Sequence, residues 1–170
     1  MRAIGIVMAA VLFTGWTFAG WTPAMWAQQP AAQAMKTFAS SADVQNLIAN
    51  AKKIRKTDQP MVSQPILQLA PYRVNLEYRP VVGPASIHEK EAELFYVIEG
   101  AGTLVTGGKL ANERRTNAAN LTGTAIEGGT PQGVSKGDFF FVPENTAHWF
   151  SEIKSAIVVM SLHVPRSEAK

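Results

Sequence analysis

The feature that most constrains the fold is a series of short strand-like segments that begins near Pro65. Polar and apolar residues alternate over residues 72–79, which is the period-two pattern of a strand with two different faces. Further strands are predicted over 94–98, 103–106, 139–142, 148–152 and 157–164, with Gly, Pro and Asn turns between them. Many short strands with regular turns predict an all-β sandwich or barrel. The polar segment 111–130 is interpreted as a long, partly mobile insertion between the two halves of that barrel.

A short amphipathic helix is predicted before the strands, within an arm that covers residues 35–64. Ser40 and Ser41 are the candidate N-caps. The apolar residues that follow have helical spacing, at Val44, Leu47, Ile48, Ala51 and Ile54. We expect this helix to pack on the outside of the β-structure.

The first 34 residues have the order of a secretory signal peptide. Arg2 is the one charged residue in this leader, and residues 3–19 are almost uninterruptedly apolar. Two small-residue motifs typical of signal-peptide cleavage sites follow, and they predict cleavage after Ala27 or after Ala34. The alternative is an uncleaved anchor, for which 17 apolar residues is at the short limit. We therefore expect a bacterial periplasmic or secreted protein, with a short C-terminal tail at 167–170.

Composition excludes several classes of function. The formal net charge is only +3, and the basic cluster at residues 52–56 lies where the predicted helix ends, so no nucleic-acid partner is expected. After the leader no segment has the roughly 20 apolar residues of a membrane span, so no membrane role beyond export is expected. The chain has no cysteine, which excludes disulfides, thiolate metal ligands and a cysteine nucleophile.

Two of the three histidines lie in segments with regular spacing. Four residues separate His88 from Glu93, and six separate Glu93 from Gly100. In the second segment, five residues separate Gly137 from Pro143, and His148 follows. These segments resemble the two motifs of the cupin superfamily, G-x5-H-x-H-x3,4-E-x6-G and G-x5-P-x-G-x2-H-x3-N. The resemblance implies a single cupin barrel, a double-stranded β-helix or jelly roll, over residues 65–166, and a homodimer.

One departure concerns the metal ligands that the family usually has. Ser86 stands at the first motif histidine, so the implied ligand set is reduced to His88, Glu93 and His148. Two imidazoles and one carboxylate suit Fe(II), and Mn, Zn or Ni is also compatible. Ser86 is a poor ligand when neutral, but it is a candidate to hold a metal-bound water. The alternative is a pocket without metal, in which the histidines are ordinary hydrogen-bonded lumen residues.

The alternation of side chains between the two faces of a strand gives candidates for the rest of the site. If Glu93 and His148 face the lumen, period two places three further residues beside them, namely Phe95, Val97 and Phe150. His163, on the last predicted strand, either replaces the missing ligand or is a half-exposed strand histidine.

Several charged residues near these segments are weaker candidates. Arg73, Asn75, Glu77 and Arg79 share one strand face, which is either solvated or supplies an arginine to a substrate carboxylate. Glu89 and Glu91 are interpreted as exposed loop charges.

Three functions remain open at this point. The first is an exported metal-dependent oxygenase, isomerase or lyase that acts on a small organic substrate. The second is a non-catalytic periplasmic protein that binds a sugar or organic acid in the same cup without metal. The third is a structural or interaction domain, because a fold alone does not dictate function.

Overall fold

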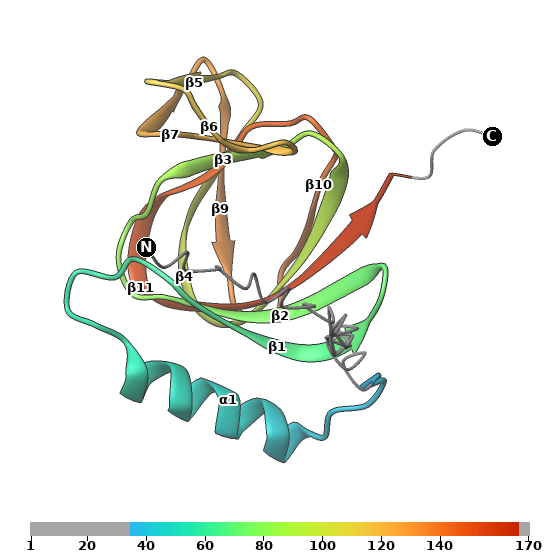
Figure 1. Ribbon diagram of the computed structural model, residues 1–170. Helices are drawn as coiled ribbons and strands as arrows, with labels where there is room; N and C mark the ends of the chain where they lie inside the picture. Colours follow the sequence, from blue (N-terminus) through green and yellow to red (C-terminus); the bar gives the residue numbers. More distant parts are fainter. Residues whose placement is uncertain (1–34, 167–170) are drawn as a thin grey trace, which may run out of the picture. The chain divides into compact units, whose positions relative to one another are not determined.

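The computed structural model describes residues 35–166, which form a β-barrel with one flanking helix (Figure 1). The predicted signal peptide and the C-terminal tail lie outside the described residues. The elements in chain order are α1 (Ser41–Ile54), β1 (Val62–Leu69), β2 (Tyr72–Arg79), β3 (Ala85–His88), β4 (Glu91–Thr106), β5 (Lys109–Ala111), β6 (Arg114–Asn117), β7 (Asn120–Gly123), β8 (Ala125–Glu127), β9 (Thr130–Ser135), β10 (Phe139–Val142) and β11 (His148–Pro165). The predicted all-β fold with a short N-terminal helix is therefore confirmed.

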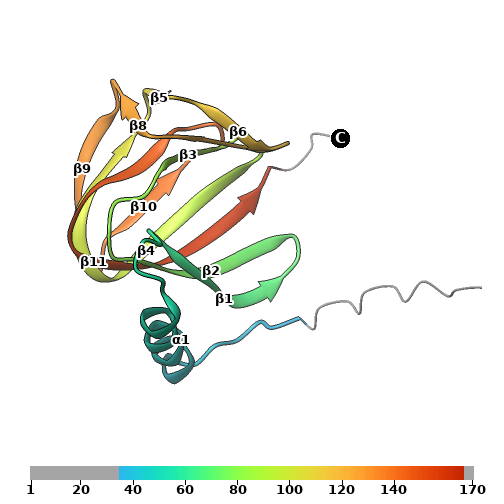
Figure 2. The ribbon, with the colours of Figure 1, turned by 60° about the vertical axis from the view of Figure 1, so that its left-hand side comes forward.

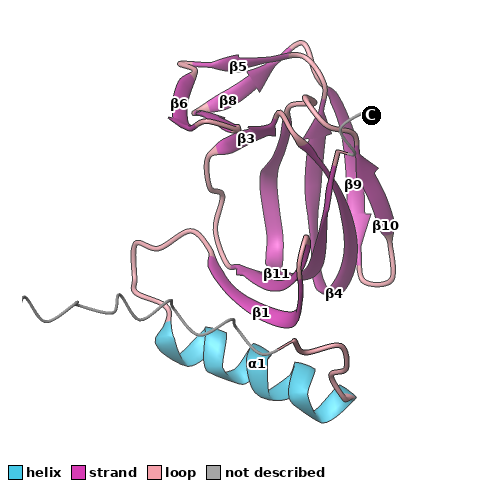
Figure 3. Cartoon of the chain, turned by 45° about the vertical axis from the view of Figure 1, so that its right-hand side comes forward, coloured by secondary structure: helices cyan, strands magenta, loops and turns pink. Residues whose placement is uncertain are grey.

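Helix α1 begins at a capping box and covers the outer face of the β1–β2 side of the barrel (Figure 3). The Ser40 hydroxyl accepts a hydrogen bond from the Asp43 backbone, and the Asp43 carboxylate accepts one from the Ser40 backbone. Lysines in the last turn complement the helix dipole. The apolar face of α1 buries Ile48 and Ala51 against the sheet, as the amphipathic spacing predicts.

The barrel is organised around two long strands, β4 and β11, which pair antiparallel along almost their whole length. Strand β11 curves around the barrel in Figures 1 and 2 and also pairs with β2, while β4 pairs with β9 and β10. The segments expected as separate strands at 94–98 and 103–106 form one continuous strand. The same is true of 148–152 and 157–164, because irregularities in pairing bend β11 rather than end it.

Two apolar layers lie on opposite faces of the sheet that contains β2, β4 and β11. The layer inside the barrel includes the lumen residues predicted from parity, Phe95, Val97 and Phe150. The outer layer packs α1 against residues such as Leu76 and Val158. Burial on β4 alternates accordingly, with Phe95 and Val97 fully buried and Leu94, Tyr96 and Ile98 partly exposed.

The polar segment 111–130, interpreted from its composition as a long insertion, contains regular strands. It contains β6, β7 and β8, and β7 pairs with β3 along residues 85–88. Strand β6 is exposed along its whole length, so it has no apolar alternation from which a strand could be predicted. The pairing of β7 with β3 matters because it brings Asn120 beside His88.

Within residues 35–166 no helix has the length and apolar character that a membrane crossing requires.

Candidate metal centre

His88, Glu93 and His148 come from three strands and meet inside the barrel. His88 ends β3, Glu93 lies near the start of β4, and His148 begins β11. The Nε2 atoms of His88 and His148 lie 3.4 and 3.3 Å from the same oxygen, Glu93 Oε2. One potential ligand atom from each residue therefore falls within 4.8 Å of the other two, a spacing that could hold a metal ion.

His163 also faces this group and is not a half-exposed strand histidine. Strand β11 runs between β2 and β4, so that His163 lies opposite Arg73 on one side and Glu93 on the other. Its Nε2 lies 3.1 Å from Glu93 Oε1, and the residue is only 8% exposed. All three histidines of the chain thus surround one carboxylate.

The Glu93 carboxylate is buried, and one of its oxygens has no hydrogen-bond donor among the described residues. That oxygen is Oε2, which the imidazoles of His88 and His148 approach without the geometry of a hydrogen bond. A buried carboxylate oxygen without a donor is costly. Two imidazole nitrogens and a carboxylate oxygen are the donor set of many Fe, Mn and Zn sites, so the residues present fit a divalent metal.

The electrostatics of the site keep Glu93 ionised. Burial acts to raise the pKa of the Glu93 carboxyl, but the imidazoles of His148, His163 and His88 outweigh it, so the pKa lies well below its usual range. Burial likewise acts to lower the pKa values of His88 and His163. Their contacts with Glu93 outweigh that effect and raise both pKa values.

Each imidazole is oriented by an acceptor at its other ring nitrogen. His88 Nδ1 lies 2.6 Å from Asn120 Oδ1, and His148 Nδ1 lies 3.3 Å from the Thr146 carbonyl oxygen. His163 Nδ1 lies 3.0 Å from Glu91 Oε1. In a neutral imidazole, an acceptor at Nδ1 keeps the proton there and leaves the Nε2 lone pair directed at Glu93.

Glu91 is correspondingly not the exposed loop charge that its position in the sequence indicates. Its side chain is 15% exposed and accepts hydrogen bonds from His163 and from Arg73. Glu89 fits the expectation better, because it pairs near the surface with Arg115.

The polar face of β2 is solvated at Arg73, whose side chain is 58% exposed, but it enters the barrel interior at Glu77 and Arg79. Glu77 is 5% exposed, and its Oε2 accepts hydrogen bonds from Arg79 Nε and Nη2 at 2.9 and 2.7 Å. The Ser161 hydroxyl donates to Glu77 Oε1 at 3.3 Å. Glu77, Glu93 and His163 form a second group whose ligand atoms lie within 4.8 Å of one another. The bond to Arg79 already balances the charge of Glu77.

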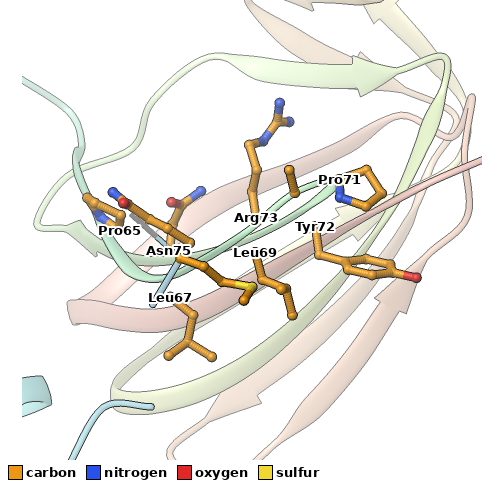
Figure 4. Close-up of a pocket in the computed structure, with 10 residues that line it drawn as sticks. Pro65, Leu67, Leu69, Pro71, Tyr72, Arg73 and Asn75 are labelled. Carbon is orange, nitrogen blue, oxygen red and sulfur yellow. The ribbon is translucent and has the colours of Figure 1, made fainter. Parts of the chain in front are cut away.

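A cavity of about 560 Å³ lies along the β1–β2 hairpin, and Figure 4 shows its lining. Leu69, Tyr72, Arg73 and Asn75 contribute to its walls. Arg73 also donates to Glu91, so this cavity is connected to His163 by two successive hydrogen bonds. Of the weak candidates, Arg73 therefore lies at the edge of the site and Arg79 lies deeper, 5.0 Å above the Phe150 ring.

Aromatic side chains form the apolar floor of the site. Phe95 stacks on Phe140 with 4.6 Å between ring centroids, and Phe150 meets both rings edge-on. The Phe95 ring centroid lies 6.1 Å from that of His148. Val97 is fully buried in the same cluster.

Sequence analysis alone did not identify four polar residues of the site. The sequence predicts Glu91 to be exposed, it leaves open whether the face that carries Glu77 is solvated, and it does not single out Asn120 or Ser161. The usable signal was present for Glu77, since it shares a face with two arginines on a strand whose other face is apolar. No comparable signal existed for Asn120, which acts through a strand pairing that the sequence does not show.

Comparison with known proteins gives several distant structural relatives. Among solved structures, the chain is similar to KdgF from Halomonas sp., with 17% identity over 66% of this chain and 87% of that one and a TM-score of 0.48. It is also similar to TT1209 from Thermus thermophilus, with 16% identity over 68% and 94% of the two chains and a TM-score of 0.45. A third similar structure is hydroxypropylphosphonic acid epoxidase from S. wedmorenis, with 15% identity over 64% of this chain and 53% of that one and a TM-score of 0.49.

No curated protein matches the sequence. The family model described as Cupin matches residues 38–169, which include the helix and every strand of the barrel. The chain therefore belongs to the cupin family.

Proposed function

We propose that this cupin is an exported protein that holds one divalent metal ion on His88, Glu93 and His148 and acts on a small organic substrate. The observation that carries the proposal is the Glu93 Oε2 atom, which is buried without a donor between two imidazole nitrogens. A bound Fe, Mn, Zn or Ni ion would supply a Lewis acid with open coordination positions, or a centre for O₂ activation in the case of iron.

The surrounding residues orient the two imidazoles and exclude water from one side of the site. Asn120 and the Thr146 carbonyl hold the two imidazoles so that their Nε2 atoms face Glu93. The cluster of Phe95, Phe140 and Phe150 excludes water from below. His88 is the most exposed of the three proposed ligands, with 20% of its side chain accessible, so we expect substrate to approach from its side.

Elemental analysis of protein purified without chelator tests the metal site. We expect near-stoichiometric metal in the wild type, and loss of that metal in His148→Ala and Glu93→Ala. Glu89→Ala is the matched control, because this carboxylate is nearby but pairs with Arg115 instead. Absence of metal from the wild type after reconstitution with each of the four metals would contradict the proposal.

Turnover distinguishes an enzyme from a binding protein. Glu93→Ala should abolish turnover of a small-molecule substrate while circular dichroism shows the same fold. Ligand binding without turnover, unchanged in Glu93→Ala, would instead support a non-catalytic periplasmic protein that binds a sugar or organic acid.

The proposal of export rests on the sequence of the first 34 residues. N-terminal sequencing of protein from the periplasmic or secreted fraction should begin at Gln28 or Met35. An intact N-terminus at Met1 in the membrane fraction would support the anchor instead.

A further inference from the structure

The outer face of the barrel sheet carries two apolar rows that cross neighbouring strands in register. One row crosses β1, β2, β11, β4 and β10 and consists of Leu67, Val74, Leu162, Leu94 and Phe141, each paired with the next. The second crosses β2, β11, β4 and β10 and consists of Leu76, Met160, Tyr96 and Phe139. Residues directly opposite each other in a sheet share a face, so both rows are continuous. Neither row contains a charged residue, as is typical of the core of a protein interface.

Helix α1 covers only the β1–β2 end of these rows. It lies along β1 and β2, away from β10 (Figure 1), and Leu76 packs in the cluster beneath it. At the β10 end, Phe139 and Phe141 are 66% and 58% exposed. The ring centroids of Phe139 and Tyr96 lie 4.6 Å apart, so these exposed rings belong to one surface.

The uncovered surface continues in two directions. A groove of about 480 Å³ leads toward the N-terminal end of α1, and Phe38 and Tyr96 are among its lining residues. In the other direction, Leu69 and Tyr72 extend the surface to the β1–β2 hairpin. We call this surface the outer apolar face, which consists of Phe38, Leu69, Tyr72, Leu94, Tyr96, Phe139, Phe141 and Leu162.

The area of the outer apolar face matches what one partner of a stable complex buries. At about 200 Å² for a whole aromatic side chain, its four most exposed aromatic residues present roughly 500 Å² to solvent. With Tyr96 and the leucines, the total is on the order of 800 Å², which is the contribution of each partner to a standard interface. Monomeric soluble proteins rarely expose an apolar patch of this size.

Strand β10 gives a second reason to expect a covering partner. Among residues 35–166 it pairs with β4 alone, so its other backbone edge is unpaired. Exposed sheet edges are usually protected by charged residues or proline. Residues 139–142 are instead three phenylalanines and a valine. An apolar edge strand of this kind associates with other chains unless it is covered.

The charges beside the outer apolar face favour a protein partner over a membrane. Surfaces that bind anionic lipids are surrounded by lysine and arginine. The turn that precedes Phe139 carries both signs, with Lys136 and Asp138 exposed. An isologous dimer needs a face that fits a copy of itself, and two uncharged rows of aliphatic and aromatic side chains meet that requirement.

We propose that the outer apolar face is the contact surface between two copies of this chain related by a two-fold axis. The resemblance to cupins implies a homodimer but specifies no surface. Leu69 and Tyr72 also line the cavity beside Arg73, so the second copy closes one side of that cavity. The inference does not rest on the metal site proposed above.

Sedimentation equilibrium of the purified protein at micromolar concentrations tests the association. We expect twice the mass of one chain in the wild type. Phe139→Glu and Phe141→Glu together should raise the dissociation constant by at least about 100-fold, because the contact would then bury carboxylates without partners. Both phenylalanines are more than half exposed, so we expect this double variant to keep the circular dichroism spectrum of the wild type. Val82→Glu is the matched control, since Val82 is 43% exposed in the loop between β2 and β3 and should leave the dimer intact.

Hydroxyl-radical footprinting tests where the two copies meet. Phe38 and Tyr72 touch neither substituted residue and should react more slowly in the wild-type dimer than in the double variant. Trp149 packs in a different cluster and should react equally in both.

A wild type that is monomeric at these concentrations would overturn the proposal. If that monomer also bound vesicles of phosphatidylglycerol, the outer apolar face would be a membrane-contact surface instead. A double variant that remains dimeric would overturn the proposal as well, because the copies would then associate through another surface. Equal reactivity of Phe38 and Tyr72 in dimer and monomer would contradict a contact that spans this face.

Discussion

The ion pair between Glu77 and Arg79 gives the sharpest prediction about stability. Arg79 donates to the Glu77 carboxylate through two nitrogens, at 2.7 and 2.9 Å, and their side chains are 18% exposed for Arg79 and 6% for Glu77. Replacing Arg79 with methionine leaves Glu77 with one polar partner, the Ser161 hydroxyl at 3.3 Å. The variant also loses the contact of the guanidinium with the Phe150 ring.

The magnitude follows from the burial of the carboxylate that remains. Removing one partner of a buried pair costs about 3–5 kcal/mol, because an uncompensated charge stays in the protein interior. Partial exposure of Arg79 places the expected loss of unfolding free energy at the lower end, at about 3 kcal/mol. Replacing both residues with methionine should recover most of this loss, since no isolated charge is then left.

Urea unfolding of the metal-free protein, followed by tryptophan fluorescence, measures these differences. The control is Lys52→Met, which breaks the pair with Glu99, in which the side chains are 46% and 37% exposed. This change should cost less than about 1 kcal/mol. The reasoning is refuted if Arg79→Met lies within about 1 kcal/mol of the wild type, or if the double variant is as unstable as the single one.

Three further predictions concern the site and the bend in the sheet. Asn120→Ala should weaken metal binding by about tenfold, measured by chelator competition, because His88 loses the acceptor at its Nδ1; an unchanged affinity would contradict this role. In the metal-free protein, His88 and His163 have raised pKa values, so their contribution to stability is complete below about pH 6.5 and is lost as the pH rises through their folded-state pKa values. The midpoint of thermal unfolding should therefore fall as the pH rises above about 6.5, and a constant midpoint would count against these shifts. Gly100→Ala should destabilise the fold by about 2 kcal/mol or more in urea unfolding, because φ is +84° and a Cβ would lie 2.2 Å from the Ala156 carbonyl oxygen. Gly133→Ala meets no atom within 4 Å and should have little effect, and equal effects of the two substitutions would contradict the argument.

Motif spacing predicted which residues of the first segment meet those of the second. His88 and Glu93 lie on either side of one turn, and His148 begins a strand that pairs with both of their strands. These relations follow from local sequence and from the resemblance to the family. They suffice for the fold and for three members of the site.

The direction of His163 could not be predicted from its own segment. Residues 157–162 are almost all apolar, because one face of β11 packs inside the barrel and the other packs on the outer layer under α1. A strand buried on both faces has no visible alternation, so nothing reveals which face a polar residue takes. The register with Glu93, which decides the question, is a long-range property of the pairing.

The burial of Glu77 on the charged face of β2 could not be predicted for a different physical reason. Charged side chains are seldom buried unless they are paired. The partner of Glu77 on the same strand is visible in the sequence, but Ser161 and Glu91, which complete the network, come from β11 and β4. A solvated face was therefore the natural expectation from one strand considered alone.

The two long strands have a consequence for how the imidazoles around Glu93 are spaced. His148 and His163 are 15 positions apart on β11 (148 to 163), a stretch that would span about 50 Å if straight. Both nevertheless contact the Glu93 carboxylate, because β11 curves around the barrel (Figure 1) and its pairing with β4 is irregular between Phe150 and Val159. The separation of these two imidazoles is therefore governed by the curvature of the backbone at the bend. Substitutions there, which touch no imidazole, would therefore change the distance between two histidines that hold the same carboxylate.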